Sequence, residues 1–203
     1  MSGDKAVTDE FVGYEALIRF AEERALQYLE GDMVEIGAYM GGGTVKLAEF
    51  ARKFGKKVYA IDIFDAAHDT TMSPRGVMAS DVYQAFLTGE TMLQVYRETT
   101  RGFDNIVTVM EDSMKFRFPK GQKLSFGFVD GCHQQVYVEN DFHIIWPNLV
   151  SGGVVGFHDY RFGDWPEVTK AVDGLMEAHR GEIGEAQEIE AGYGILSIML
   201  TKR

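Results

Sequence analysis

Histidines and aspartates gather in two short segments of the second half of the chain. Asp130-Gly131-Cys132-His133 follows one apolar run, and His158-Asp159 follows another. An imidazole titrates near neutral pH and can remove a proton from a reacting group. Two carboxylates and one imidazole can instead hold a divalent cation, either Mg²⁺ or a transition ion. The candidate catalytic residues are therefore His133, His158 and Asp130, and the candidate metal ligands are Asp130, His158 and Asp159.

A glycine-rich segment, VEIGAYMGGGT, ends at Thr44. It follows the order of apolar run, glycine turn and helical pattern that forms a ligand site at the carboxyl end of a first parallel strand. Tyr39 stands where a dinucleotide-binding turn needs its second glycine, and no lysine precedes Thr44 as a phosphate loop requires. Both of those sites are excluded, and the pattern is E-x-G-x-x-x-G-x-x-T, from Glu35 through Gly37 and Gly41 to Thr44.

Other polar residues end the remaining expected strands. Asp62 ends the run KVYAIDI, and an acid at this position of a parallel sheet can accept both hydroxyls of a ribose. Asp112 and Ser113 follow the apolar run that ends at Met110. Because ligands bind outside the carboxyl ends of parallel strands, we expect these residues to share one site.

The elements that position these residues alternate along the chain. Apolar periodicity predicts an N-terminal helix at 8–30, and an irregular segment at 64–80 is long enough to be a lid or acceptor loop. The alternation predicts a mostly parallel sheet with helices on both faces, and the short final connection predicts a terminal hairpin with one antiparallel strand. Strands are expected at 33–36, 57–63, 105–110, 124–129, 154–157, 186–189 and 194–200. Further helices are expected at 42–54, at 81–101 with a break near 88–89, at 138–149 with an end or kink at Pro147, and at 164–181. A turn is expected at 151–153.

The glycine motif resembles the first motif of the class I S-adenosylmethionine-dependent methyltransferases. The segment FVDGCHQQVYVENDFHIIWPNLVSGGVVGFHDY further resembles a subgroup of small-molecule O-methyltransferases. That subgroup carries Asp-Gly-x-His after the fourth strand, a Trp-Pro helix end, a Gly-Gly turn and His-Asp after the fifth strand. The resemblance covers about residues 33–200. It implies a Rossmann-like, doubly wound, mostly parallel seven-stranded sheet with a C-terminal antiparallel hairpin.

The resemblance also implies roles for the site residues. Glu35 would lie near the methionine end of S-adenosylmethionine, Asp62 would hold the ribose, and Asp112 and Ser113 would meet the adenine. Related enzymes place Mg²⁺ at the ends of the fourth and fifth strands, usually with Asp-Asp or Asp-Asn where this chain has His-Asp, so Mg²⁺ and another divalent cation both stay open. The full set of expected cofactor-binding residues is Glu35, Gly37, Ala38, Tyr39, Gly41, Thr44, Asp62, Ile63, Asp112, Ser113 and Asp130.

Composition narrows the class of partner. The 203 residues suit a single domain, here one methyltransferase domain over 1–203, with 1–31 as its N-terminal helical segment. A net charge of −11 disfavours nucleic acid and favours a small molecule, including a cationic one. One cysteine, with neither a signal-like N-terminus nor a membrane-length apolar run, favours the cytoplasm. The aromatic N-terminal helix and the methionine-containing loop suggest a homodimer surface.

The expected activity is methylation of a hydroxyl on a small molecule, with a histidine as general base. One alternative is a nicotinamide-dependent oxidoreductase on a similar sheet, which the missing G-x-G-x-x-G disfavours. Another is a non-catalytic protein that kept the fold and the cofactor site, because a fold alone does not establish catalysis.

Overall fold

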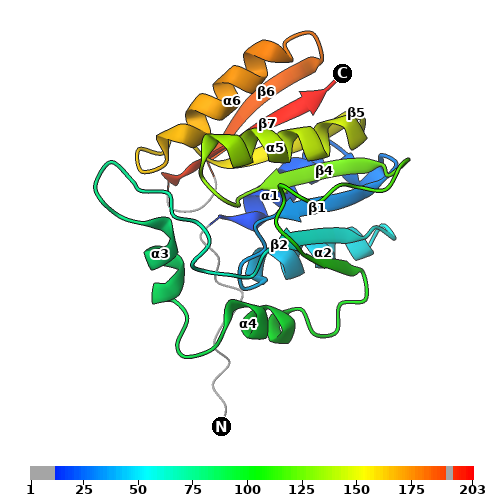
Figure 1. Ribbon diagram of the computed structural model, residues 1–203. Helices are drawn as coiled ribbons and strands as arrows, with labels where there is room; N and C mark the ends of the chain where they lie inside the picture. The colour runs from blue at the N-terminus through cyan, green and yellow to red at the C-terminus, as the bar shows by residue number, and fades with distance from the viewer. Residues whose placement is uncertain (1–11, 191–193) are drawn as a thin grey trace.

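The computed structural model describes residues 12–190 and 194–203 and forms a seven-stranded sheet with helices on both faces (Figure 1). The strand order is β3-β2-β1-β4-β5-β7-β6, and all pairs from β3 to β5 are parallel, whereas β7 runs antiparallel to both of its neighbours. The predicted α/β class and terminal hairpin are confirmed. The strands are β1 (Asp32–Ile36), β2 (Val58–Asp62), β3 (Ile106–Met110), β4 (Leu124–Val129), β5 (Leu149–Tyr160), β6 (Ile183–Glu190) and β7 (Leu196–Lys202).

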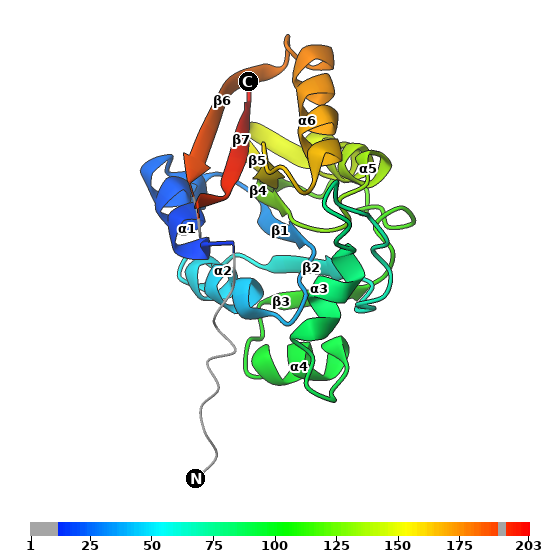
Figure 2. The same ribbon diagram turned by 90° about the vertical axis from the view of Figure 1, so that its left-hand side faces the viewer.

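The helices form two layers, with α1 and α2 on one face and α5 and α6 on the other (Figure 2). Leu17 of α1 and Leu47 of α2 pack with Phe128 of β4, whereas Phe142 of α5 and Val172 of α6 pack against the opposite face. The helices are α1 (Tyr14–Glu23), α2 (Gly42–Arg52), α3 (Ala79–Ala85), α4 (Met92–Thr99), α5 (Gln135–Ile145) and α6 (Pro166–Ala178), with 3₁₀ turns η1 (Leu26–Tyr28) and η2 (Trp146–Asn148).

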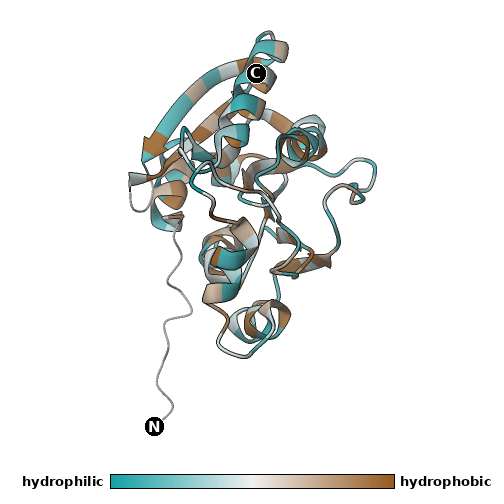
Figure 3. Cartoon of the chain, turned by 60° about the vertical axis from the view of Figure 1, so that its left-hand side comes forward, coloured by the Kyte–Doolittle hydropathy of each residue, from teal (hydrophilic) through white to brown (hydrophobic). Residues whose placement is uncertain are grey.

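Burial along the strands follows their position in the sheet. All six residues of β4 are buried, as expected for a strand that is covered on both faces. Polar and apolar residues are mixed along the edge strand β6, as the colours of Figure 3 show, and every residue of this strand is partly or fully exposed. The apolar centre therefore provides a rigid support for the carboxyl ends of β1, β2, β4 and β5.

Three local predictions need correction. The single helix expected over 8–30 is shorter: residues 8–11 lie outside the described part, α1 ends at Glu23, and Ala25 adopts a left-handed backbone with φ 57°. Tyr28, which falls within the expected helix, is 75% exposed. Leu149, expected on a helix, begins β5, and residues 151–153, expected as a turn, lie inside β5 where its register with β4 shifts. Periodicity failed here because a 3₁₀ turn follows α5 directly and carries the same apolar spacing into the strand.

The other boundaries match within a few residues. The expected break near 88–89 separates α3 from α4, and Thr91 begins α4 with a reciprocal capping box to Gln94. Pro147 falls in η2, directly after α5, as expected from its lack of a backbone N–H. None of the helices in residues 12–190 and 194–203 is long and apolar enough to cross a membrane.

Candidate active site

A cavity of about 370 Å³ lies at the carboxyl ends of β1, β2, β4 and β5. It has the position that open parallel sheets use for ligands. Of the eleven expected cofactor-binding residues, all except Gly41 and Thr44 line it, and these two lie directly behind the wall. All four histidines and aspartates of the expected catalytic and metal set, Asp130, His133, His158 and Asp159, also line it. The cavity therefore brings both groups of residues together, and their roles in binding and catalysis stay a prediction.

The glycine turn lets β1 approach β4 very closely. Gly37 has φ 94°, and a Cβ at this position would lie 2.1 Å from the carbonyl oxygen of Asp130. Gly41 begins α2 in the left-handed region, with φ 86°. A Cβ at Gly43 would lie 2.2 Å from the ring of Tyr14, so α1 packs directly on this turn. These three positions require glycine for backbone or steric reasons.

Glu35 lies in the centre of the sheet and is held from two sides. The hydroxyls of Tyr14 and Thr44 donate to its two carboxylate oxygens. Burial raises the pKa of Glu35 to about 7, although both hydroxyl donors act against that change. The carboxyl of Glu35 therefore titrates near neutral pH at the edge of the cavity. Thr44, expected to bind the cofactor, is a hydrogen-bond donor to Glu35.

Asp62 organises the turns around it. Its Oδ2 accepts from the backbone N–H of Tyr39 at 2.8 Å, and its Oδ1 accepts from that of Phe64 at 2.6 Å. Burial raises the pKa of Asp62, and these backbone donors limit the rise. The carboxylate thus joins the end of β2 to the glycine turn, with further acceptor capacity directed to the cavity.

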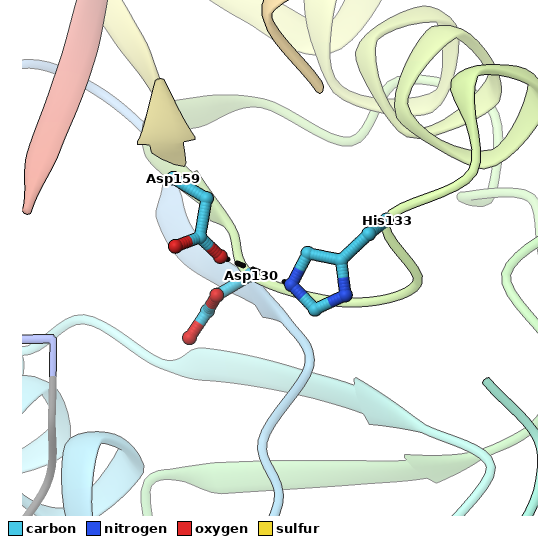
Figure 4. A group of neighbouring side chains, drawn as sticks. All are labelled: Asp130, His133 and Asp159. Atoms are coloured by element: carbon cyan, nitrogen blue, oxygen red, sulfur yellow. Dashed lines mark hydrogen bonds and ion pairs between the residues drawn. The ribbon is translucent and has the colours of Figure 1, made fainter. Parts of the chain in front are cut away.

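His133 contacts two carboxylates shortly before α5, and Figure 4 shows its contact with one of them, Asp159. Its Nδ1 is 2.8 Å from Oδ2 of Asp69, and its Nε2 is 3.0 Å from Oδ2 of Asp159. Burial alone would lower the pKa of His133, but hydrogen bonds to Asp159 and Asp69 outweigh it and raise the pKa to about 9. The same contacts hold the pKa values of both aspartates well below their usual range. The cluster is therefore an imidazolium between two carboxylates at neutral pH.

His158 lies near the end of β5 and faces Asp130 and Asp159. Its Nδ1 lies 3.1 Å from Oδ1 of Asp130 and 3.3 Å from Oδ2 of Asp159. Burial lowers its pKa, but the charge of Asp130 leads the opposing contributions, and the net effect raises the pKa to about 10. The ring is nevertheless not aligned for a hydrogen bond from either nitrogen to a group in the described part of the chain. Asp159 itself has φ 57°, a strained conformation for a non-glycine residue.

Asp130, His133 and Asp159 form a group that can hold a metal ion. One ligand atom from each lies within 4.8 Å of the other two, and the three side chains converge in Figure 4. The sequence-based set contained His158 in place of His133. Both imidazoles contact Asp159, and His158 also lies 3.1 Å from Asp130, so the metal ligands remain a prediction with either histidine as the third donor.

Aromatic rings enclose the imidazole of His133. The ring of Trp165 stacks on it at 4.5 Å between centroids and 20° between planes, and the ring of Tyr83 is nearly parallel to it at 6.4 Å and 17°. Tyr83 comes from α3 and Trp165 directly precedes α6. A protonated imidazole is favoured between ring faces.

The segment 64–80 contributes directly to the site. Its Asp69 is buried, bonds His133, and also accepts from the backbone N–H and hydroxyl of Thr71. Sequence reasoning missed Asp69, Tyr14, Tyr83 and Trp165. An Asp followed two residues later by Thr is a local turn signal, but nothing in the sequence indicates that Asp69 reaches His133 in the loop between β4 and α5.

Comparisons with known proteins place the chain in a family. A family model described as a methyltransferase domain matches residues 34–160, more than half of the chain. The chain belongs to this methyltransferase family. That assignment confirms the expected enzyme class and decides against the oxidoreductase alternative. The matched segment begins in β1 and ends with β5, so it contains the glycine turn and both His/Asp segments.

Solved structures share the fold of this methyltransferase at low sequence identity. The O-methyltransferase NovP has a TM-score of 0.67 at 16% identity, covering 93% of this chain and 78% of NovP. Calicheamicin methyltransferase CalS11 has a TM-score of 0.65 at 13% identity, covering 91% and 77%. The S-adenosylhomocysteine-bound PaMTH1 of Podospora anserina has a TM-score of 0.61 at 14% identity, covering 94% and 77%. They confirm the Rossmann-like methyltransferase fold.

Proposed function

We propose that the protein transfers a methyl group from S-adenosylmethionine to a hydroxyl of a small molecule. The observation that carries this proposal is that one cavity joins the glycine turn after β1 to the buried cluster of Asp130, His133 and Asp159. Methyl transfer needs a donor site and a proton-accepting site that face each other, because the acceptor oxygen must align with the methyl carbon as it loses its proton.

The cofactor would lie across the ends of β1 and β2. Asp62 would receive the ribose hydroxyls, and Asp112 and Ser113, which line the cavity beyond β3, would meet the adenine. Glu35 and the turn at Gly37 would face the sulfonium and its amino-acid end, where nearby carboxylates favour a cation. The S-adenosylhomocysteine-bound state of PaMTH1 supports this type of ligand for the fold.

Proton removal falls to an imidazole of the His133–His158 pair. Two carboxylates lie beside each ring and balance the positive charge of its protonated form: Asp69 and Asp159 beside His133, and Asp130 and Asp159 beside His158. A histidine can accept the hydroxyl proton only in its neutral form. Positive charge that binds beside Asp130 and Asp159 with the ligand would lower the pKa of both imidazoles toward neutral pH.

The donor set fits a divalent cation. Asp130, His133 and Asp159 converge, with Asp130 partly buried and the other two buried. The buried imidazole of His158 has no hydrogen-bond partner in the described part of the chain. Asp130 and Asp159 would hold such an ion with His133 or His158, and it would supply a Lewis acid that lowers the pKa of the acceptor hydroxyl. The histidine that is not a ligand then serves as base.

The charge of the cavity favours a neutral or cationic acceptor. Within the described part of the chain its lining contains neither lysine nor arginine. CalS11 is described as a TDP-rhamnose 3'-O-methyltransferase, which acts on an anionic nucleotide sugar; we do not expect such an acceptor here because repulsion would oppose its binding. The carboxylates of the lining are Glu35, Asp62, Asp65, Asp69, Glu111, Asp112, Asp130 and Asp159.

Two experiments test this function. Calorimetric titration with S-adenosylhomocysteine should give binding, and NAD should give none; no heat with S-adenosylhomocysteine contradicts the proposal. Methyl transfer from labelled S-adenosylmethionine is then measured on tyramine, tyrosol and 4-hydroxyphenylacetate, which share a phenol but carry positive, zero and negative charge. The proposal expects the first two to exceed the third. Binding of the cofactor without transfer to any hydroxyl in a wider panel would favour the non-catalytic alternative.

Variants separate base from metal ligand. We compare His133→Asn with His158→Asn. The variant that lacks the metal-binding histidine should lose both metal binding and activity. The variant that lacks the base should lose activity and still bind Mg²⁺ or Mn²⁺ in calorimetry. Equal metal binding and full activity in both variants would contradict a role for either imidazole.

We further propose a homodimer that uses the exposed apolar residues of the 64–80 segment, of α3 and of its C-cap, Phe86. Met72, Val77, Val82 and Phe86 are 52%, 43%, 38% and 47% exposed. Light scattering should give twice the monomer mass, and Phe86→Lys should reduce it; a monomeric mass for the unmodified chain contradicts this proposal.

A further inference from the structure

A short flap, residues 65–68, follows β2 and reaches across the cavity. The backbone N–H of Ala67 donates to Oδ1 of Asp65, and the backbone N–H of His68 donates to the carbonyl of Asp65, both at 3.0 Å. These bonds hold the flap as one compact turn. At its tip, Nε2 of His68 lies 3.1 Å from the hydroxyl of Tyr137 in the first turn of α5.

The strand order makes the contact between His68 and Tyr137 a bridge over the ligand site. β1 lies between β2 and β4 in the sheet. His68 follows β2 and Tyr137 follows β4, so their contact joins two segments from opposite sides of β1, at the carboxyl ends of the strands. Both side chains line the cavity together with Gly37 of the glycine turn. A ligand bound against that turn would therefore lie under the bridge.

Both ends of the flap are anchored more firmly than its tip. Before the flap, the backbone N–H of Phe64 donates to Asp62 at 2.6 Å, and after it, Asp69 lies 2.8 Å from Nδ1 of His133. Asp69 and His133 are 5% and 6% exposed, whereas His68 and Tyr137 are only partly buried. A hydrogen bond within reach of water is easily exchanged for bonds to water, so the flap is weakest at its tip.

We propose that the contact between His68 and Tyr137 is a gate: the flap opens there, pivots on its two anchors, and controls how fast a ligand enters and leaves the cavity. Opening also exposes Ala66, which is 8% exposed and packs with Ala38, but this costs the burial of only one methyl group. A ligand passes the gate in both directions, so the gate changes the association and dissociation rates by the same factor and leaves the dissociation constant unchanged. The inference concerns access to the cavity and goes beyond the identity of the ligand.

The single cysteine of the chain can report opening without any ligand. Cys132 lines the cavity, and its Sγ lies 3.5 Å from Oδ1 of Asp69, directly after the flap. Its labelling rate is measured with a small reagent, methyl methanethiosulfonate, and with a bulky one, fluorescein-5-maleimide. The ratio of the bulky to the small rate removes changes in thiol reactivity that affect both reagents. This ratio therefore measures how often the cavity is open.

Two variants remove the hydrogen bond of the gate and keep an aromatic ring in place, namely His68→Phe and Tyr137→Phe. Each should raise the labelling ratio about three- to tenfold, which is the effect of one lost hydrogen bond on the open population. The double variant should match either single variant, because the bond is already lost in each. Tyr59→Phe is the matched control: its hydroxyl bonds Gln122 at the same 3.1 Å outside the cavity lining, and its labelling ratio should stay unchanged.

A second measurement follows the binding of S-adenosylhomocysteine by stopped-flow fluorescence of Trp165, which lines the cavity. In His68→Phe and Tyr137→Phe, the association and dissociation rate constants should both rise by the factor seen in labelling, with an unchanged dissociation constant. The Tyr59→Phe control should keep both rate constants.

The outcomes separate this inference from the proposed function. An unchanged labelling ratio in both variants overturns the gate, whatever the cofactor does. A rise in the dissociation rate alone, with weaker binding, shows that the two residues contact the ligand and overturns the gate as well. If S-adenosylhomocysteine does not bind to the unmodified protein, the proposed function is contradicted, and the labelling ratio alone decides whether the flap opens at this contact.

Discussion

Replacing Asp141 with asparagine should change the pH dependence of stability in a defined way. Asp141 is 1% exposed, and burial raises its pKa from the ordinary 3.8 to about 7. Between these two values the folded protein keeps the proton and the unfolded chain releases it. The free energy of unfolding therefore falls as pH rises through this window, because the native state binds more protons than the unfolded state. Asparagine does not titrate, so the variant lacks this loss.

The magnitude follows from the two pKa values. A rise from 3.8 to about 7 corresponds to about 4 kcal/mol of lost stability above pH 7. The sequence pI is near 4.9, so measurements should begin at pH 5.5 to avoid precipitation. From pH 5.5 to 7, the free energy of unfolding of Asp141→Asn minus that of the unmodified protein should increase by about 2 kcal/mol, and it should then level off.

Urea unfolding at intervals of half a pH unit, with linear extrapolation to water, gives this difference. A constant offset from the changed hydrogen bond with Asn140 does not affect the slope of this difference against pH. The exposed Asp173→Asn variant serves as control and should give a difference that does not vary with pH. A flat profile for Asp141→Asn would refute the argument that this carboxyl is buried without charge compensation.

Three further predictions concern the turn, the sheet centre and the loop. Gly37→Ala should cost more than about 2 kcal/mol of stability and abolish S-adenosylhomocysteine binding, since its Cβ would meet the Asp130 carbonyl at 2.1 Å; Gly76→Ala, with φ 79° but open space, should cost only about 1 kcal/mol and keep binding. Tyr14→Phe should remove one donor from buried Glu35 and lower stability at pH 8 by about 1–2 kcal/mol in urea unfolding; an unchanged midpoint would contradict the hydrogen bond. Arg75→Ala should leave the urea midpoint unchanged, because Arg75 is 73% exposed in its pair with Asp164.

The sequence predicted the parts of the fold that depend on local pattern. Buried parallel strands read as apolar runs, and the polar residues at their ends share one edge by topology, so the meeting of Gly37, Asp62 and Asp130 could be foreseen. The N-terminal helix was overextended because apolar spacing continues past Glu23, while the left-handed backbone of Ala25, which ends the regular pattern, has no residue-type signal.

Contacts between distant segments were beyond the sequence. Tyr14 reaches Glu35 because α1 packs on Gly43, which is a property of the assembled layers. Likewise, Tyr83 and Trp165 enclose His133 from α3 and from the start of α6. A core-facing aromatic and a site-facing aromatic have the same periodicity, so spacing alone cannot separate them.

Asp69 shows why the acceptor end of the cavity is harder to read than the cofactor end. The cofactor residues lie on strands and the turns that follow them, where topology fixes their positions. Asp69 lies in the 64–80 segment, yet its carboxylate binds His133 through both the backbone N–H and the Nδ1 atom. Any displacement of this segment would therefore remove one of the two carboxylates that keep the imidazole protonated. Under the proposed function, altering this one segment would change the acceptor and leave the cofactor site in place, because loops tolerate change better than strands.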